Sequence, residues 1–303
     1  MVIVKYFKCH KLGSKLTPLL FPWRYTMTFK TLFAGVALLA SSISFADNIL
    51  IVMSDKSELE LKEGKIYKTG FYFNELMEPV KRFMDEGHTL TFATPSGVVP
   101  AMDPNSNNLQ LFGNDQAYYD AHKNLLNQIK LMDLVNSPVV SFDRVEQMGV
   151  EHFDAFFAPG GHAPMEDLLV DDQLGRILTA FHVQNKPTGL VCHGPIALLS
   201  TLPNNDEFVQ QLANGEKAVA DKNWIYNGYN MTVFSNTEED AAKGYLGGGA
   251  MKFYPQTALS KAGGDYQRSQ ADWAQKVVVD RELITGQNPA SAKAVAEEIL
   301  KQL

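Results

Sequence analysis

The sequence predicts an α/β fold, a doubly wound and mostly parallel sheet with helices on both faces. Two apolar runs, residues 48–53 and 153–158, have the continuous hydrophobic character of strands that are buried on both sides. Such runs alternate along the chain with segments expected to be helical, which is the order that a parallel sheet requires. Once a leader is set aside, the remaining length suits one large domain with a sizeable core.

The first half of the chain supplies two strands and a long excursion. The first strand is followed by a polar loop to residue 68 and by a helix over about 69–84. A second strand, 88–94, closes at a Pro-Ser-Gly turn. Residues 98–150 are polar, rich in Asn and Asp, and contain one expected helix near 118–131. A connection of this length usually has a function, such as a lid or a pocket wall, and a surface embellishment is the alternative.

The second half supplies the remaining strands, and polar residues follow several of them. After strand 153–158 we expect a helix at 171–184, strands at 188–192 and 231–234, a hairpin of 276–280 with 283–285, and a last helix from about 291. In parallel sheets, sites form beyond the carboxyl ends of the strands. The residues at such ends are Ser54, Gly161, Cys192 and Ser235.

The N-terminus is expected to be a leader and not part of the fold. From Met27, a short charged stretch precedes the apolar run 31–45 and a small-x-small sequence that ends at Ala46, as in a secretory signal peptide. Residues 1–46 are therefore interpreted as an N-terminal extension plus signal peptide, with Met27 as the true start, cleavage after Ala46 and export to the periplasm. An uncleaved membrane anchor is the alternative.

The net charge of the chain argues against some classes of binding partner. Residues 1–46 contain six basic residues and no acidic residue, so residues 47–303 keep 21 of the 27 basic residues beside all 34 acidic ones, a net charge of −13. Such an acidic body argues against nucleic acid and anionic membranes as partners. No membrane partner is expected after cleavage.

Cys192 is the cysteine that remains once the leader and Cys9 are removed. It joins a buried strand directly to a helix, which is the arrangement of a nucleophile elbow. The helix N-terminus favours a thiolate over a thiol, so the cysteine is expected to react near neutral pH. An unpaired cysteine in an exported protein also indicates a reactive thiol. The alternative is a small buried hydrophobic residue.

Neighbouring residues could complete a catalytic site. His193 offers a general base or acid, and Glu239, which follows a strand end, could orient it as the acid of a Cys-His-Glu triad. Glu238 and Asp240 compete with Glu239, and an exposed charge run at a helix start is the alternative. The glycines after strand 153–158 offer backbone N–H groups that, with the amide of His193, could form an oxyanion hole.

These motifs carry a family resemblance. Ala-Pro-Gly-Gly-His at 158–162 and Val-Cys-His-Gly-Pro at 191–195 resemble the ThiJ/PfpI superfamily of class I glutamine amidotransferase-like proteins. Further matches indicate its glyoxalase III and heat-shock holding-chaperone branch; they lie at 69–75, 100–106, 234–239 and 283–291. The resemblance covers essentially all of residues 48–302.

The resemblance implies a flavodoxin-like, class I glutamine amidotransferase-like catalytic domain over 47–303, with an insertion around 98–150. It implies that Cys192 is the nucleophile, that His193 and Glu239 complete the triad, and that Glu75 lies beside the sulfur. It places the oxyanion amides at Gly161 and His193, and it implies a homodimer. No cofactor is expected. No metal is expected either, because the histidines show no close ligand pairing in the sequence.

The function that this resemblance implies is that of a glyoxalase III, a lyase that converts the small dicarbonyl methylglyoxal to D-lactate through a Cys192 hemithioacetal. Two alternatives stay open at this point. One is a stress-related holding chaperone that binds unfolded chains. The other is a cysteine-dependent amidase, deglycase or peptidase of the same superfamily, because one triad geometry serves several acyl transfers.

Overall fold

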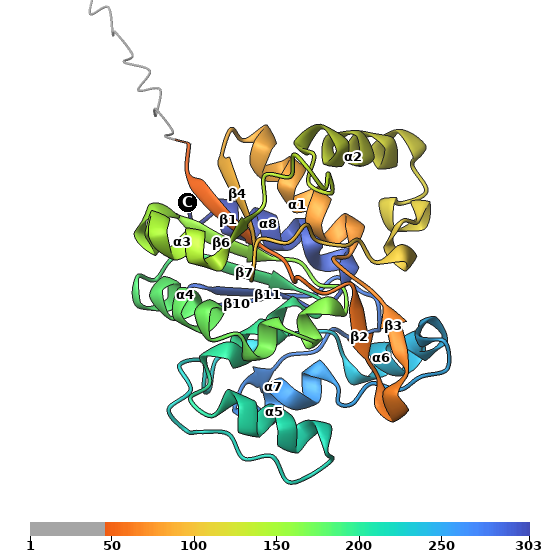
Figure 1. Cartoon of the computed structure of the whole chain (residues 1–303), viewed down its shortest axis with the longest axis vertical. Coiled ribbons are helices and arrows are strands. Elements are labelled where there is room, and N and C mark those ends of the chain that lie inside the picture. Colours follow the sequence, from red (N-terminus) through yellow and green to blue (C-terminus); the bar gives the residue numbers. More distant parts are fainter. Residues whose placement is uncertain (1–45) are drawn as a thin grey trace, which may run out of the picture. The chain divides into compact units, whose positions relative to one another are not determined.

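The computed structural model describes residues 46–303 and confirms the expected fold (Figure 1). A seven-stranded sheet has the order β10-β11-β7-β6-β1-β4-β5. Every neighbouring pair in it is parallel except β10 with β11. Its strands are β1 (Asn48–Val52), β4 (Thr89–Thr94), β5 (Val140–Ser141), β6 (Ala155–Ala158), β7 (Thr188–Val191), β10 (Val277–Asp280) and β11 (Leu283–Gly286).

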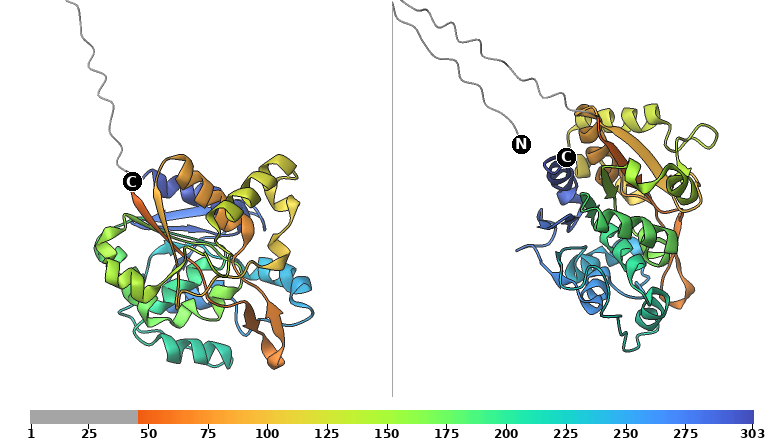
Figure 2. Two further views of the ribbon diagram at one scale, coloured as in Figure 1. Left: turned by 45° about the horizontal axis from the view of Figure 1, so that its top comes forward. Right: turned by 90° about the vertical axis from the view of Figure 1, so that its left-hand side faces the viewer.

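Helices cover both faces of the sheet, as the left view of Figure 2 shows. The helices are α1 (Phe73–Asp85), α2 (Gln116–Ile129), α3 (Phe142–Met148), α4 (Asp172–Val183), α5 (Asn205–Ala213), α6 (Asn236–Ala242), α7 (Pro255–Ala262) and α8 (Ala292–Leu300). A 3-10 helix, η7 (Gly194–Thr201), follows β7 directly. Among the described residues, the chain forms no helix with the length and apolar character needed to cross a membrane.

The strands are apolar throughout because both faces of the sheet are buried. In β1, Ile49 and Ile51 pack into a core shared with α1 and α8. Leu50 and Val52 point the other way, into a core shared with α3, α4 and η7. Successive strand residues point to opposite faces, so one apolar run feeds two cores.

Several elements differ from the sequence-based expectations. The segment expected to be a polar loop up to residue 68 contains a hairpin of β2 (Glu58–Glu60) and β3 (Ile66–Lys68). The 98–150 excursion holds not only α2 but also edge strand β5, which pairs with β4, and α3. Both β2 and β3 alternate exposed and buried residues over only three positions, which is too short a pattern to stand out in a sequence.

The expected strand at 231–234 does not join the main sheet. Only β8 (Asn230–Met231) is extended, and it pairs with β9 (Asp265–Tyr266) in a separate two-stranded sheet. Strand β11 occupies the position beside β7. Residues 232–234, the rest of the expected strand, therefore cross the end of the sheet instead. There the Phe234 N–H donates to the Cys192 carbonyl at 2.9 Å.

The topology sets where a site can form. The chain runs from β1 outward to β4 and β5, and later strands are added on the other side of β1, beginning with β6. The strand order therefore reverses between β1 and β6, and ligands of such sheets bind beyond the carboxyl ends at this point. The loop after β6 and the cysteine after β7 lie at these ends. The expected leader lies outside the described residues.

Candidate active site

Cys192 lies at the sharp turn between β7 and η7. Its φ is +61°, a left-handed conformation that is uncommon for a residue with a side chain. The turn is held because the Cys192 N–H donates to the Gly286 carbonyl at 2.9 Å. The side chain is buried, with 3% exposed. Strain of this kind is stored where the surrounding structure enforces it, as at a nucleophile elbow.

The two glycines after β6 let the backbone approach the sulfur. A Cβ on Gly160 would lie 2.7 Å from the Cys192 Cβ, from Glu75 Oε2 and from the His193 nitrogen. Gly161 has φ +86°, and a Cβ there would lie 2.0 Å from the Gly70 carbonyl oxygen. Only glycine fits at both positions. The Gly161 N–H donates to the Cys192 sulfur, so this amide, one of the two predicted to form an oxyanion hole, lies beside the sulfur.

Glu75 lies in the first turn of α1, fully buried against the cysteine. The Gly160 N–H donates to its Oε2 at 2.8 Å. Burial raises the pKa of Glu75 to about 8, against hydrogen bonds with Cys192 and Gly160 that lower it. A carboxyl with such a pKa keeps its proton at neutral pH and can donate it to the sulfur.

The expectation of a lowered thiol pKa is wrong for the resting site. Burial, followed by the charge of Glu75, raises the pKa of the Cys192 thiol. The helix end that was expected to favour a thiolate belongs to a 3-10 helix and does not outweigh the loss of solvent. Both Glu75 and Cys192 therefore keep their protons in the resting site, and their ionisations are coupled.

His193 and Glu239 lie on the other side of the sulfur. His193 Nδ1 is 3.4 Å from Cys192 Sγ, and His193 Nε2 is 2.7 Å from Glu239 Oε1. An ionised Glu239 accepts the Nε2 proton, which leaves Nδ1 as the nitrogen that faces the sulfur. The structure brings Cys192, His193, Glu239 and Glu75 together at one point.

The pKa values fit a base and its orienting acid. Burial, and then the nearby His162, lower the pKa of His193, so the ring is neutral and can accept a proton. Burial alone would raise the pKa of Glu239, but the neighbouring His193, which is hydrogen-bonded to it, and the nearby His162 hold it well below its usual range. Glu239 is fully buried and is not part of an exposed charge run.

His162 is a neighbour that the sequence analysis did not place in the site. Its ring lies 4.1 Å from the ring of His193, centroid to centroid, and its Nε2 lies 3.5 Å from Glu239 Oε2. Ligand atoms of His162, His193 and Glu239 lie within 4.8 Å of one another. The premise that no histidines pair closely is therefore wrong, because the loop after β6 folds over the elbow. These three residues could hold a metal ion, and the expected absence of a metal stays a prediction.

A cavity of about 420 Å³ opens above these residues. Cys192, His193 and His162 lie at its buried end, and more exposed residues such as Tyr245 and Trp273 surround its mouth. The excursion contributes Asn105, Asn108, Gln110 and Leu111 to the lining. The excursion thus forms a pocket wall, the functional alternative considered for it.

The buried carboxylate of Asp103 connects the wall formed by the excursion to the glycine loop after β6. Tyr67 Oη and Thr69 Oγ1 donate to Asp103 Oδ2 at 3.0 and 2.9 Å. Thr69 Oγ1 in turn accepts the N–H of His162 at 3.2 Å. Asp103 follows the isolated bridge between Phe71 and Met102, so the base of the excursion is fixed against the site.

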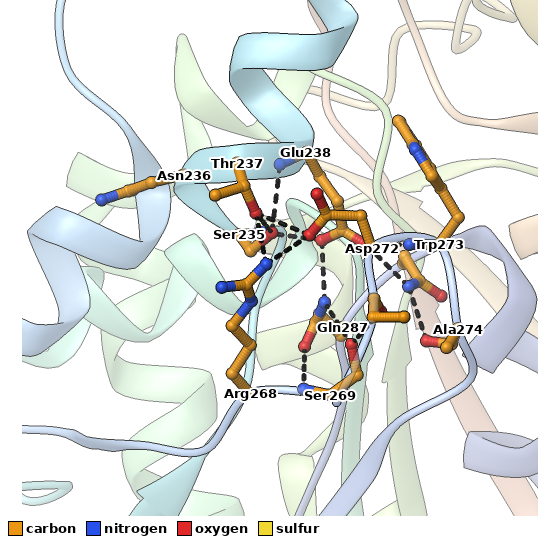
Figure 3. A network of polar contacts seen from close by, with 12 residues as sticks. Ser235, Asn236, Thr237, Glu238, Arg268, Ser269, Asp272, Trp273, Ala274 and Gln287 are labelled. Atoms are coloured by element: carbon orange, nitrogen blue, oxygen red, sulfur yellow. Dashed lines mark hydrogen bonds and ion pairs between the residues drawn. The ribbon is translucent and has the colours of Figure 1, made fainter.

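A second buried carboxylate fastens the opposite wall (Figure 3). Glu238, next to Glu239 in α6, accepts four hydrogen bonds of 2.8–3.0 Å, two on each oxygen; the donors are the backbone N–H groups of Ser235 and Trp273 and the side-chain amides of Gln287 and Asn288. Trp273, with φ +65°, is thereby held at the cavity mouth with its ring 5.5 Å from that of Phe234. The sequence indicated Glu238 only as a competitor of Glu239.

A second group of hydrogen bonds, among Arg268, Asp272 and Thr237, lies next to Glu238. Arg268 donates to Asp272 at 2.6 Å and to Thr237 Oγ1 at 2.8 Å, and Thr237 Oγ1 donates to Asp272 at 2.6 Å. Figure 3 shows these three side chains beside Glu238, joining the loop that carries Trp273 to the start of α6. The loop that carries Trp273 and the start of α6, the helix that carries Glu239, are therefore held by one network.

The fold and the elbow cysteine define a class I glutamine amidotransferase-like protein. Residues 66–232 match the family model described as ThiJ/PfpI family-like. The chain therefore belongs to the ThiJ/PfpI family.

Three curated relatives are similar over most of both chains. A Schizosaccharomyces pombe protein named "Probable glutathione-independent glyoxalase hsp3103" is 26% identical, over 84% of this chain and 98% of its own. Glyoxalase 3 of Candida albicans is 24% identical, over 83% and 96%. Protein/nucleic acid deglycase HchA of Staphylococcus aureus strain RF122 is 24% identical, over 84% and 79%.

Solved structures show the same fold. The Rapid Encystment Protein 24 KDa of Francisella tularensis superposes with a TM-score of 0.64 at 24% identity, covering 84% of this chain and 98% of that one. Glyoxalase III of Candida albicans gives a TM-score of 0.57 at 20% identity, covering 85% and 97%. The ThiJ/PfpI fold thus extends over the described domain.

Proposed function

We propose that this protein is a glutathione-independent glyoxalase of the glyoxalase III type, a lyase that converts methylglyoxal and water to D-lactate. The observation that carries the proposal is the unbroken series of contacts from Glu75 through Cys192 and His193 to Glu239 at the end of a cavity. Relatives named as glyoxalases support it.

The first step is attack by sulfur. Cys192 Sγ adds to the aldehyde carbon while its proton passes to His193 Nδ1, 3.4 Å away. Glu239, held ionised beside Nε2, stabilises the imidazolium that forms. The carbonyl oxygen becomes an oxyanion that the Gly161 and His193 amides can stabilise. The His193 imidazolium returns its proton to this oxyanion, which gives a neutral hemithioacetal and leaves His193 able to accept a proton again.

The second step moves a proton between the two carbons of the substrate. The hydrogen on the former aldehyde carbon leaves as a proton to His193, and the electron pair that it leaves behind forms an enediol. Reprotonation at the neighbouring carbon turns the ketone into a hydroxyl and the aldehyde carbon into a thioester. Water then cleaves the carbon–sulfur bond and restores the thiol. The substrate supplies its own oxidant, so no cofactor enters the reaction.

Glu75 has a separate part in this scheme. Because burial raises the pKa of Glu75 to about 8, its protonated form can donate a hydrogen bond to the sulfur and favour a thiolate without adding a second negative charge. It is therefore proposed as the donor that poises Cys192 for attack.

A deglycase is the second candidate, because a relative carries that name. The same sulfur and the same amides would serve hydrolysis of a sugar-derived adduct. The holding-chaperone alternative has no comparable observation in its favour.

The test is D-lactate formation from methylglyoxal without glutathione. We expect turnover by the purified protein, none by Cys192→Ala, and full turnover by Cys9→Ala, which removes the other cysteine of the chain. Absence of D-lactate from the unaltered protein, with Cys192 shown to be reduced, would contradict the proposal and shift the assignment to the deglycase class.

A further inference from the structure

We infer that the preferred substrates are 2-oxoaldehydes that carry a polyhydroxyl chain, the dicarbonyls that reducing sugars form when they degrade. This inference rests on the proposed glyoxalase function and goes beyond it, because methylglyoxal carries no such chain. The lining of the catalytic cavity supports it in three ways.

The first support is size. The cavity measures about 420 Å³, within the range of roughly 300–1,000 Å³ that holds drug-sized ligands. A three-carbon dicarbonyl bound to Cys192 fills only the buried end. The remaining space leads toward Gln110, Tyr245 and Trp273 at the mouth, so a longer chain on the ketone carbon has room to extend.

The second support is the absence of charge. None of the residues that line this cavity is Lys, Arg, Asp or Glu, although one residue in five of the chain is charged. A carboxylate or phosphate on the substrate would find no cationic partner there. The lining instead contains five carboxamides: Asn74, Asn105, Asn108, Gln110 and Asn288. Neutral donors and acceptors of this kind match hydroxyl groups.

Some of these amides have hydrogen-bonding capacity to spare. Asn74 Oδ1 is buried and has no partner among the described residues, which is a costly state unless a ligand or water satisfies it. Asn105 donates to Tyr67 Oη at 2.8 Å, and its side-chain oxygen accepts no hydrogen bond from a described residue. The Gln110 side chain makes no hydrogen bond with any described residue. Asn288, by contrast, is fully used by Glu238, Ala274 and Ser291.

The third support is an aromatic surface beside the amides. Tyr72, Tyr245 and Trp273 line the same cavity. The C–H faces of a polyhydroxyl chain are apolar, whereas its hydroxyl edges are polar, so rings next to amides contact both. The Trp273 backbone N–H donates to Glu238 at 2.8 Å, and the Trp273 ring lies 5.5 Å from that of Phe234; holding the backbone in this way reduces the ordering cost of binding.

The chemistry balances as it does for methylglyoxal. Cys192 Sγ forms a bond to the aldehyde carbon, that carbon loses its hydrogen as a proton, and the ketone carbon gains the electron pair and a proton. One water cleaves the thioester. The product is a 2-hydroxy acid that keeps every hydroxyl of the chain, and no outside oxidant or reductant is consumed.

The experiment compares 3-deoxyglucosone with methylglyoxal and phenylglyoxal on the full purified protein, with kcat/KM expressed per open-chain aldehyde. We expect the highest value for 3-deoxyglucosone. We also expect Gln110→Ala and Trp273→Leu each to lower the ratio of 3-deoxyglucosone to methylglyoxal at least fivefold. Gln128→Ala, an exposed glutamine on α2 away from the cavity, is the matched control and should leave the ratio unchanged.

The outcomes separate the two proposals. Turnover of methylglyoxal with a lower value for 3-deoxyglucosone would overturn this inference and leave the glyoxalase function standing. A highest value for phenylglyoxal would also overturn it, because volume and apolar contact would then explain the cavity. Turnover of none of the three would overturn the glyoxalase function and this inference with it.

Discussion

Glu75 and Cys192 share a buried site in which water cannot stabilise either charge. Burial raises the pKa of both groups, that of Glu75 to about 8. The pair is stable when both groups keep their protons and is costly when both are charged. Reactivity of the sulfur therefore depends on transfer of the thiol proton to a neighbouring base, not on a simple lowering of the thiol pKa.

This pair predicts how the stability of the protein depends on pH. A glutamate of ordinary pKa 4.5 that rises to about 8 on folding binds a proton in the folded state where the unfolded chain has lost it. Its contribution to stability is present below pH 4.5 and is lost as the pH rises toward 8. We expect the Tm of the unaltered protein to fall over this range and the Tm of Glu75→Gln to fall less. Calorimetry at a series of pH values would measure both.

The control for this prediction is an exposed carboxylate. Glu63→Gln removes a charge in a solvent-exposed position and should keep the pH dependence of the unaltered protein. Parallel curves for the unaltered protein and Glu75→Gln would show that Glu75 does not hold its proton on folding.

The site residues differed in how far the sequence could reveal them. Cys192 and His193 follow from a strand-to-helix junction, which is a local pattern. Glu75 is an ordinary-looking glutamate 117 positions before the cysteine, and only the family resemblance indicated it. His162 was missed, because its contact with Glu239 depends on how the glycine loop folds over the elbow, and no spacing encodes that.

At the scale of elements, Glu238 ties α6 to the loop before β10. Its four donors come from three separate segments, so the carboxylate holds both the start of α6, the helix that carries Glu239, and the backbone of Trp273. We expect Glu238→Gln to lower the free energy of unfolding by at least about 2 kcal/mol, because two donors lose their acceptor at roughly 1–3 kcal/mol each. Urea denaturation would measure this.

The same variant should loosen the Trp273 loop. We expect faster hydrogen exchange over residues 267–276 in Glu238→Gln. Asp240→Asn is the matched control, since Asp240 lies two positions further along α6, is exposed and pairs with Lys243 at 2.7 Å; such a surface pair contributes less than about 1 kcal/mol. Equal exchange in the two variants would contradict the role given to Glu238.

The loop after β6 allows a separate prediction. Gly161 and Gly87 have nearly the same φ, +86° and +88°, but a Cβ meets the Gly70 carbonyl oxygen at 2.0 Å in the first and open space in the second. Gly87→Ala should cost only the left-handed backbone, about 1–2 kcal/mol. In Gly161→Ala the new Cβ would also clash with the Gly70 carbonyl oxygen, so the loop would have to shift. We therefore expect a clearly larger loss of the free energy of unfolding, measured by urea denaturation. Equal losses of the free energy of unfolding in the two variants would show that the loop can shift without further cost.

At the scale of the whole molecule, the sequence predicted six of the seven strands of the main sheet and the helices α1, α2, α4 and α8, and it missed several smaller elements. Strands β1, β4, β6, β7, β10 and β11 were predicted because each is a short segment composed mainly of apolar or β-branched residues. The helices α5 and α7 and the hairpin β2–β3 were not, because their burial depends on packing against distant segments. Residue 231 onward was predicted as a sheet strand on local apolar character alone, and β11 takes the place that such a strand would need.

Export, the leader at 1–46 and a homodimer stay predictions, since they concern the undescribed N-terminus or a partner.

The charge of the remaining chain gives one more prediction about partners. With 34 acidic residues beside 21 basic ones in residues 47–303, the domain should repel a phosphate backbone, because non-specific nucleic-acid binding depends on Lys and Arg neutralising phosphates. The cavity, which contains no Lys or Arg, offers no local exception.

We therefore expect no binding of duplex or single-stranded DNA in a mobility-shift assay, even at about 0.01 M ionic strength, where the Debye length of about 30 Å leaves charges poorly screened. The result bears on the second candidate function, since a relative is named a protein/nucleic acid deglycase. A shift that weakens with added salt would reveal a basic surface strong enough to overcome the net charge. No shift would argue against nucleic acid as the substrate of a deglycase activity in this protein.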